Sequence, residues 1–467
     1  MRISLSKTGK LSGNILLVTI LTGIVVGLTL VGFLRLVDVQ SKSVQRSQTW
    51  NQSLAVTEAG IEDGMAFINQ YAGTQNIAAW TNTATANNWT VSGGNVFSTT
   101  RYLDAAHTIY YTVWVTNLNF ATPAIRCTGS VPGPVWLSNP NRISRTVLIT
   151  AKTEVLFNAA MAALGTIDLK GNNIETDSFD SSATNYPGYW TSSIRRANGD
   201  VATDGKITGI LVVGNANVAG HVMTGPGGTI SIAANGSVGD LPWVDLPTPG
   251  IEPGYSSDDM NVIFESVVIP GPPQMIWNGA PGSGNAPTYT YSGTTITGTN
   301  SSQSFAHVIT SSGNYTINDS GDIYVGSNCV VNLKVISSVG TFSPNYLYGA
   351  GTGTNAAKVT CYVDCANATL GSNDKPQGGG LAGNMVFLGT PNCTSLSYKG
   401  NGDFTGAMYF PQADFQLAGG GSGVIDFIGS SVTKTVQMNG HYHFHFDEAL
   451  KKWNPNNAYV ASSWREL

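Results

Sequence analysis

The sequence has little charge: Lys, Arg, Asp and Glu make up 11% of its 467 residues, and the formal net charge is −5. A nucleic-acid-binding protein needs a clustered basic face, so this class is excluded. A disordered chain is rich in charge and poor in apolar residues, so it is excluded too. The sequence also lacks the G-x-S-x-G, Walker and H-E-x-x-H motifs. The enzyme classes that depend on these motifs are therefore excluded.

Cysteine is scarce, with five residues. Cys361 and Cys365 form a C-x-x-x-C pair, which is not the C-x-x-C of a redox or zinc site. Two alternatives stay open for the four cysteines of the C-terminal half: a disulfide among them, with undetermined connectivity, or free thiols. These four are Cys329, Cys361, Cys365 and Cys393. We interpret Cys127 as a buried free thiol.

One long apolar run is present, the twenty uncharged residues from Ile15 to Leu34. As a helix with a rise of about 1.5 Å per residue, they would span roughly 30 Å, the thickness of a bilayer's hydrocarbon core. Arg2, Lys7 and Lys10 precede the run, and no basic cluster follows directly after it. The positive-inside rule then places the N-terminus in the cytoplasm. We predict one membrane span, with the chain after it outside the cytoplasm.

The helical pattern continues beyond the apolar run. Apolar side chains recur at spacings of four, seven, four and three, which places them on one stripe of a helix: Trp50, Leu54, Ile61, Met65 and Ile68. This stripe predicts that one helix begins in lipid and then lies on a globular body. Inside the apolar run, small residues that allow close packing between helices stand at Gly23, Gly27 and Gly32, although glycine is also common in membrane helices without this role.

The N-terminal segments resemble those of type IV pilin-like proteins of the PilX class. The resemblance rests on the leader 7–13, on the apolar helix after it and on the segment 55–62, Ala-Val-Thr-Glu-Ala-Gly-Ile-Glu. It implies that a prepilin peptidase cuts after Gly13, leaving Asn14 as the first mature residue. Major pilins carry Glu at the fifth mature position, where this sequence has Val18. This departure resembles minor pilins, which start or cap a filament of pilin-like subunits.

After the helix, two segments rich in β-branched and aromatic residues predict strands, at 107–115 and 143–151. The four prolines between them predict a loop: Pro123, Pro132, Pro134 and Pro140. We expect an antiparallel β head over 74–156. From about 157, short apolar pulses recur between Gly and Asn turns, which is typical of successive coils of a β-solenoid. A proline-rich stretch, 242–273, predicts a connector that crosses the outside of the body or joins two stacks of coils.

The segments 406–414, 417–421, 429–434 and 439–450 resemble a domain found behind PilX-like N-termini in bacterial surface proteins, which has no assigned reaction. The resemblance implies a right-handed β-solenoid. The predicted organisation is therefore mainly β with a long N-terminal α-helix: leader 1–13, helix 14–73, pilin-like α/β head 74–156, β-solenoid 157–450 and C-terminal tail 451–467.

One cluster has metal-ligand character. On a strand, His441, His443, His445 and Asp447 would share one face, where imidazoles and a carboxylate could meet a zinc or copper ion. Neighbouring side chains on that face are about 7 Å apart, so a single straight strand rarely supplies three ligands. The alternative, which this spacing favours, is that the aromatic residues between them face the last coil while the histidines cover an unpaired edge.

Two further hypotheses concern carbohydrate. Glycoside cleavage needs two carboxyl groups about 5–10 Å apart, and four aspartates are available: Asp322, Asp403, Asp414 and Asp426. They stand in no recognisable motif, so solvated or corner roles are favoured. Aromatic groups could stack on sugar rings, although core packing or loop anchoring is favoured for each: Tyr186, Tyr189 and Trp190, and Tyr289 with Tyr291.

We interpret the chain as a non-enzymatic, cofactor-free, pilin-like protein of the bacterial inner membrane, with its bulk periplasmic or surface-exposed in a filament. Its expected partners are the membrane, other pilin-like subunits and the prepilin peptidase, with surface carbohydrate as a further hypothesis and no nucleic acid. The alternatives are a membrane-tethered β-helix enzyme acting on carbohydrate and a plain envelope structural protein.

Overall fold

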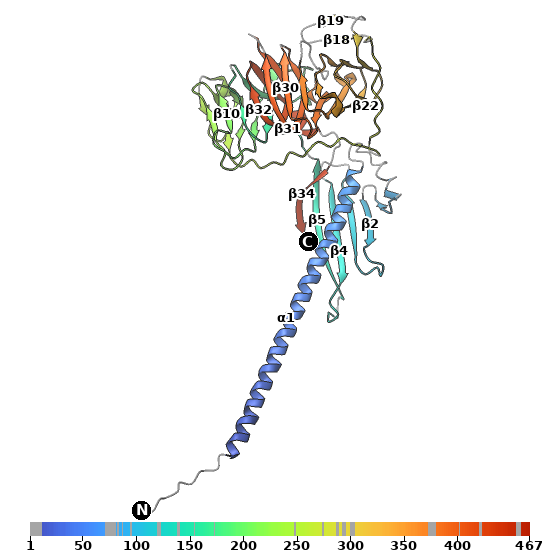
Figure 1. The fold of residues 1–467 in the computed structure, drawn as a ribbon, viewed down its shortest axis with the longest axis vertical. Helices are drawn as coiled ribbons and strands as arrows, with labels where there is room; N and C mark the ends of the chain where they lie inside the picture. The colour runs from blue at the N-terminus through green and yellow to red at the C-terminus, as the bar shows by residue number, and fades with distance from the viewer. Residues whose placement is uncertain are drawn as a thin grey trace, which may run out of the picture. The chain divides into compact units, whose positions relative to one another are not determined.

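One long helix and an extensive set of β-strands make up the protein (Figure 1). The computed structural model describes residues 12–70, 81, 84–85, 87–93, 96–118, 123–137, 141–153, 155–171, 173–246, 249–272, 275–285, 289–291, 296–298, 304–371, 380–400, 402–419, 423–453 and 459–467. The described chain forms two units. We call Met1–Glu154 with Asn456–Leu467 the helix–sheet unit, and Val155–Pro455 the parallel β unit. The prediction of a mainly β protein with a long N-terminal helix is confirmed.

Helix α1 extends from Ser12 to Asn69 without a break. Its first part is exposed from Ile15 to Val39 and carries no charge as far as Leu34, and it is long and apolar enough to cross a membrane. The few hydroxyl groups in this part have internal partners. Thr19, Thr22 and Thr29 each donate to carbonyl oxygens three and four residues earlier, at 2.8–3.0 Å. The hydroxyl groups of this segment therefore need no water.

The second part of α1 packs on a six-stranded antiparallel sheet with strand order β1-β2-β3-β4-β5-β34. Its strands are β1 Thr90–Ser92, β2 Val96–Tyr102, β3 Tyr110–Thr116, β4 Ala124–Pro132, β5 Arg142–Thr153 and β34 Tyr459–Glu466. Along β3, residues alternate strictly between buried and half-buried positions, as expected for a strand with one face covered by a helix. The buried face of the sheet and the helix share one core.

Small residues allow the helix to approach this sheet closely. A Cβ atom at Gly60 would collide with Cys127 Sγ, and one at Gly64 would lie 2.7 Å from Ile125 Cγ2. Thr57 accepts a hydrogen bond from the backbone N–H of Gly129 at 3.1 Å. The centre of the helix–sheet contact is therefore made of glycine and a hydroxyl group rather than of large apolar side chains.

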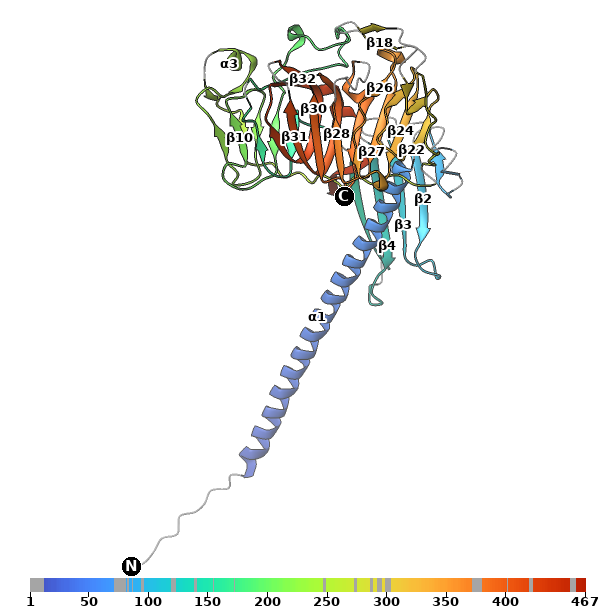
Figure 2. The ribbon, with the colours of Figure 1, turned by 45° about the horizontal axis from the view of Figure 1, so that its top comes forward.

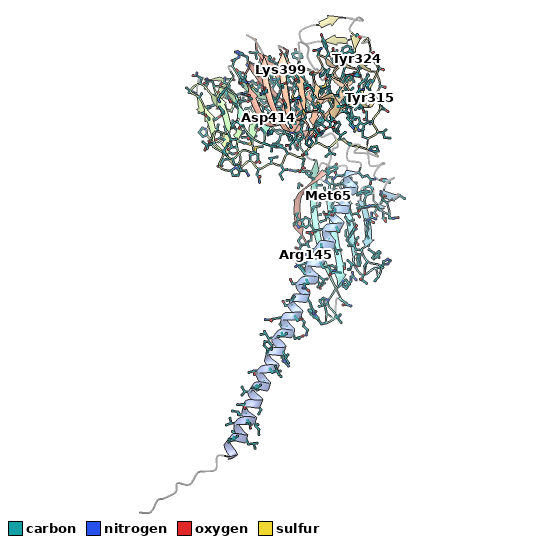
Figure 3. All side chains as sticks on the ribbon, in the orientation of Figure 1. Met65, Arg145, Tyr315, Tyr324, Lys399 and Asp414 are labelled. Atoms are coloured by element: carbon teal, nitrogen blue, oxygen red, sulfur yellow. The ribbon has the colours of Figure 1, made fainter. Side chains whose placement is uncertain are left out.

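The predicted apolar stripe describes this contact only in part. Ile61 and Ile68 are buried in it, and Leu54 and Met65 flank it, whereas Trp50 is 43% exposed. The Trp50 ring lies instead under the guanidinium of Arg145, 4.9 Å from its Cζ atom. Figure 3 labels Met65 on the helix and Arg145 on the sheet.

Polar contacts hold the middle and the C-terminal end of the packed part of α1 to the sheet. Asp63 Oδ2 accepts from Arg101 Nε at 2.6 Å and from Tyr111 Oη at 3.0 Å. At the end of α1, Asn69 exchanges two hydrogen bonds with the backbone of Tyr459, of 3.0 and 2.7 Å. The first residue of β34 is thus tied to the last residue of the helix.

Two expectations for this unit need correction. The proline-rich segment between the predicted strands contains β4, because Pro123 and Pro132 lie at its ends and leave a strand with an alternating pattern between them. The expected tail 451–467 contains β34, which pairs antiparallel with β5. The last six residues of β34 are all exposed on this edge strand, and four of them carry hydroxyl or charged side chains, so the segment has no sequence signal of burial.

The parallel β unit, residues 155–455, consists of strands that pair mainly in parallel with other strands of the same unit (Figure 2). Before the proline-rich stretch these are β6 Met161–Ala163, β7 Ile167–Asp168, β8 Glu175–Phe179, β9 Val201–Thr203, β10 Leu211–Gly214, β11 Asn217–Ala219, β12 Val222–Met223, β13 Ile230–Ile232, β14 Ser237–Gly239, β15 Gly250–Ile251 and β16 Ser256–Ser257. A short helix, α3, covers Leu241–Asp245.

The later strands are β17 Gly284–Asn285, β18 Tyr289–Tyr291, β19 Ile296–Gly298, β20 Ser304–Phe305, β21 His307–Ile309, β22 Gly313–Ile317, β23 Ile323–Val325, β24 Val330–Val335, β25 Thr341–Phe342, β26 Leu347–Gly349, β27 Lys358–Val363, β28 Asn367–Leu370, β29 Met385–Gly389, β30 Ser395–Gly400, β31 Phe404–Gly419, β32 Ile425–Met438 and β33 Tyr442–Asp447. The pairs β17–β20 and β18–β19 are antiparallel.

The strands are not stacked in chain order. The last long strands, β32 and β33, pair with β6, β7 and β8, the first strands of the unit. The chain thus enters the stack in its middle, builds outward to β16 and returns to build inward from β22. The strands of this unit therefore do not follow one another in chain order through the stack, because β6, β7 and β8 pair with β32 and β33.

An extended segment, 258–272, connects the two ends of this stack (Figures 1 and 2). Near its start, Met260 N donates to Thr224 O at 3.0 Å, next to β12. In its middle, the carbonyl of Glu265 accepts from Tyr409 Oη of β31 at 2.8 Å. Further on, Asn278 N donates to Asn314 O of β22 at 2.9 Å. The segment therefore runs along the outside of the parallel strands, where its prolines need no partner for a missing N–H.

Candidate functional site

The most distinctive side-chain cluster lies on three adjacent parallel strands, β32, β33 and β8. In register, Asp426 pairs with His443 and His443 pairs with Glu175, while His445 pairs with Asp177. The alternate residues of β33 point inward and are fully buried: Tyr442, Phe444 and Phe446. Strand alternation therefore presents both histidines on the outer face, beside carboxylates of the two neighbouring strands.

His445 stands between two carboxylates. Its Nδ1 lies 2.7 Å from Asp177 Oδ1 and its Nε2 lies 3.4 Å from Asp426 Oδ1. The same Asp426 oxygen is 4.0 Å from His443 Nδ1. One ligand atom from each of Asp426, His443 and His445 falls within 4.8 Å of the others. In the described part of the chain, these three residues are the group of His, Cys, Asp or Glu side chains whose spacing could hold a metal ion.

A covering segment, 180–198, encloses one side of this cluster. Trp190 stacks on the ring of His445, with centroids 3.7 Å apart and planes 22° apart. Arg195 donates from Nε to Asp177 at 2.9 Å and from Nη1 to Asp245 at 2.7 Å. Asp177 is thus held by a guanidinium on one side and an imidazole on the other. This arrangement fixes the orientation of the His445 ring.

The two neighbouring carboxylates favour the protonated form of His445. Burial alone would lower the pKa of His445, but the hydrogen bonds to Asp177 and Asp426 outweigh it, so the pKa is raised. Burial likewise opposes the charge of Arg195, while Asp245 and Asp177 raise its pKa. A third carboxylate borders the cluster, since Glu175 Oε2 lies 4.0 Å from His443 Nε2 and 4.0 Å from Arg195 Nη2.

The opposite side of the cluster is open to solvent. The side chains of Asp426 and His443 are 36% and 22% exposed, whereas that of His445 is 2% exposed. Asn173 Nδ2 lies 3.5 Å from His443 Nε2 at this open side. A small ligand could therefore reach Asp426 and His443 without displacing Trp190.

The structure corrects the predicted ligand set. His443 and His445 belong to the cluster, but His441 precedes β33 and lies outside it. Asp447 is buried and accepts hydrogen bonds from Ser181 N, Ser181 Oγ and Ala449 N at 2.7–3.1 Å, so it anchors the covering segment instead. Burial raises the pKa of Asp447. The alternative that the histidines block an unpaired edge is also wrong, because β33 is paired on both sides.

The sequence pattern missed Asp426 and Asp177 as partners of the histidines because they lie on other strands. Asp426 is separated from His443 by 17 residues and Asp177 is 268 residues from His445. Their alignment depends on strand register, which the local sequence does not encode. The motif-like spacing of His443 and His445 was the available signal, and it located two of the three residues in the cluster.

All five cysteines are buried free thiols in the structure, so the disulfide alternative is not realised. Cys365 and Cys393 occupy equivalent positions, two residues before the paired residues Asn367 and Ser395 of β28 and β30, and each donates its Sγ–H to the carbonyl of that residue. Burial raises the pKa of Cys393 and that of Cys127 to about 12. These thiols are therefore structural and unreactive in the folded protein.

The helix residues predicted for processing and packing lie at the N-terminal part of α1. The leader up to residue 11 lies outside the described residues, and α1 already includes Gly13 and Asn14. A Cβ at Gly23, Gly27 or Gly32 would meet nothing within 4 Å. These three glycines therefore pack against nothing in the part of the chain that the structure describes.

The aromatic and acidic candidates have local partners. Trp190 covers His445, and Tyr186 stacks on Phe179, while Tyr189 is 59% exposed. The side chains of Tyr289 and Tyr291 lie outside the described part of the chain. Three of the four candidate aspartates accept local hydrogen bonds: Asp322 from the backbone of 345 and 346, Asp414 from Thr435, and Asp403 from the backbone of Asp426.

Comparison with known proteins gives one match. Residues 288–453 match the model of a domain of unknown function, DUF7305. No curated protein and no solved structure matches the chain. The matched range includes Asp426, His443 and His445, whereas Asp177 and the covering segment precede it.

Proposed function

We propose that this chain is a membrane-anchored, non-enzymatic surface protein of the pilin-like type, whose helix anchors or assembles it and whose β body projects into the extracytoplasmic space. The observation that carries the proposal is α1, an unbroken helix that is apolar and exposed in its first part and packed on an antiparallel sheet in its second.

The exposed part of α1 demands an apolar partner. Each large apolar side chain left in water forgoes roughly 1.5–3 kcal/mol relative to burial, and the exposed ones follow one another from Ile15 to Val39. The total is on the order of tens of kcal/mol, which lipid or the helices of neighbouring subunits would recover. The internally bonded threonines and the small residues at Gly23, Gly27 and Gly32 suit both environments.

The second part of α1 supports the pilin-like rather than the plain-anchor interpretation. A plain anchor needs no rigid continuation, yet α1 is fixed to the sheet through Gly60, Asp63 and Asn69. Such a rod with a sheet packed on its far half is the architecture that we propose as a pilin-like head. The absence of a carboxylate at Val18 agrees with a minor position in a filament.

We further propose that the parallel β unit is a β-solenoid. Its strands repeat in parallel register, as in β24–β27–β29 and β28–β30–β31, and their inward residues form one continuous core. The paired strands leave few free edges, which suits an exposed body. Its role would be structural or adhesive display, with carbohydrate as the candidate surface ligand.

The mature N-terminus tests the proposal. The full chain is expressed with and without a prepilin peptidase, and the N-terminal peptide is identified by mass spectrometry. Asn14 as the first residue, present only with the peptidase and absent from the Gly13→Val variant, supports pilin-type processing. An intact Met1 in the presence of an active peptidase contradicts it. Extraction of the protein from membranes by carbonate would contradict the anchor itself.

A further inference from the structure

We propose that Asp426, His443 and His445 bind a divalent transition-metal ion of the zinc class, with water completing the coordination on the open side. This site is separate from the helix on which the proposed function rests. The metal-site proposal is therefore independent of pilin-type assembly, and each can fail without the other.

The distances between ligand atoms suit a tetrahedral ion. Metal–ligand bonds of about 2.0–2.2 Å at tetrahedral angles place ligand atoms about 3.3–3.5 Å apart. His445 Nε2 and Asp426 Oδ1 are already 3.4 Å apart. His443 Nδ1 is 4.0 Å from the same oxygen, so a small rotation of this half-exposed ring completes the set.

His445 is oriented as metal-binding histidines are. Its Nδ1 faces Asp177 at 2.7 Å, so a proton held there leaves the Nε2 lone pair directed toward Asp426 and His443. Arg195 fixes Asp177 at 2.9 Å, and Trp190 stacks on the ring at 3.7 Å. The buried ligand is thus positioned by contacts that would exist before an ion arrives, which lowers the ordering cost of binding.

The donor set selects the class of ion. Two imidazoles and one carboxylate suit zinc and its first-row neighbours, whereas calcium and magnesium prefer oxygen ligands throughout. Three protein ligands with an open fourth position also match the exposure of Asp426 and His443. An ion here would join β32 to β33, the strand against which the first strands of the unit are stacked.

The test uses the full chain in detergent, stripped with a chelator and titrated with zinc chloride by calorimetry. Five proteins are compared. They are the wild type, the ligand variants Asp426→Asn and His443→Gln, the positioning variant Asp177→Asn and the matched control His441→Ala, which removes an imidazole from the same sequence cluster but from outside the site. The two ligand positions are partly exposed, so their variants are expected to fold, and circular dichroism checks this. Asp177→Asn keeps all three ligands but removes the carboxylate that orients His445 and pairs with Arg195.

We expect one zinc ion per wild-type chain, and the same stoichiometry and affinity in His441→Ala. Asp177→Asn should weaken binding by about 10–100-fold, and loss of Asp426 or His443 as a ligand by more than this. A wild type that binds no zinc at micromolar concentrations would overturn the proposal. Binding by Asp426→Asn and His443→Gln that equals that of the control would overturn it as well.

Discussion

The close approach of α1 to its sheet predicts that Gly60→Ala destabilises the helix–sheet unit, although alanine is the better helix former. The alanine Cβ would collide with Cys127 Sγ and lie 2.7 Å from Tyr111 Cδ2. Both neighbours are buried in the strands β4 and β3, so neither can move away into solvent. The helix itself must shift outward.

The two opposing effects can be compared. Replacing glycine by alanine inside a helix stabilises it by about 1 kcal/mol. Overpacking a well-filled core costs about 1–3 kcal/mol, and collision with both a sulfur atom and a ring falls at the upper end of this range. The net effect is a loss of about 1–2 kcal/mol in the free energy of opening of this unit, which is about a 5–30-fold change in the open population.

Cys127 itself reports this opening. Its thiol is buried in the folded unit, where its pKa is raised to about 12, so an alkylating reagent reacts only with opened molecules. Alkylation of the Cys127 peptide, followed by mass spectrometry at pH 8, should be about 5–30-fold faster in Gly60→Ala. Gly32→Ala is the control, since its Cβ meets nothing within 4 Å. Slower alkylation of Cys127 in Gly60→Ala than in the wild type would refute the packing argument.

Three further predictions concern the helix end, alkaline pH and the parallel strands. Asn69→Ala removes both hydrogen bonds to Tyr459 and should lower the free energy of opening of β34, measured by hydrogen exchange, by about 1–2 kcal/mol. Asn69→Asp keeps the acceptor, so its free energy of opening should fall by less. Burial raises the pKa of Cys127 from its ordinary value of 9.0 to about 12, so the stability contributed by its protonated thiol is complete below pH 9.0 and is lost as the pH rises toward 12. A Cys127→Ala variant whose alkaline unfolding is unchanged would contradict this. Gly429 has φ of +145° and abuts the backbone of the neighbouring strand, so Gly429→Ala should destabilise the parallel β unit by about 2–4 kcal/mol in denaturant unfolding, while Gly271→Ala, which meets nothing within 4 Å, should leave its midpoint unchanged.

Helix α1 was predicted from the local sequence pattern, but the centre of its packed face was not. The uncharged run from Ile15 and the spacing of Ile61 and Ile68 were sufficient to predict a helix that changes from fully exposed to packed on one side. The true centre of the packed face, at Thr57, Gly60 and Gly64, was missed. Small residues add almost no hydrophobic signal to a periodicity, yet they decide how closely two backbones approach.

The candidate site shows the same limit in the β unit. Alternation along β33 placed His443 and His445 on one face with no reference to any other strand. The partners Asp426 and Asp177 became visible only through the register of β32 and β8. Parallel strands are connected through long excursions, so no turn type fixes which residues face each other.

By itself, the sequence determined what depends on neighbouring residues: a helix long enough to cross a bilayer, strands rather than helices after it, and two imidazoles on one strand face. Only the tertiary structure decided that β33 stacks on β8, that β34 returns to the first sheet and that Asp426 meets both histidines. Backbone N–H and C=O groups are alike in every strand. Pairing partners are therefore chosen by how the whole set of side chains fills the core, and a local pattern does not contain that choice.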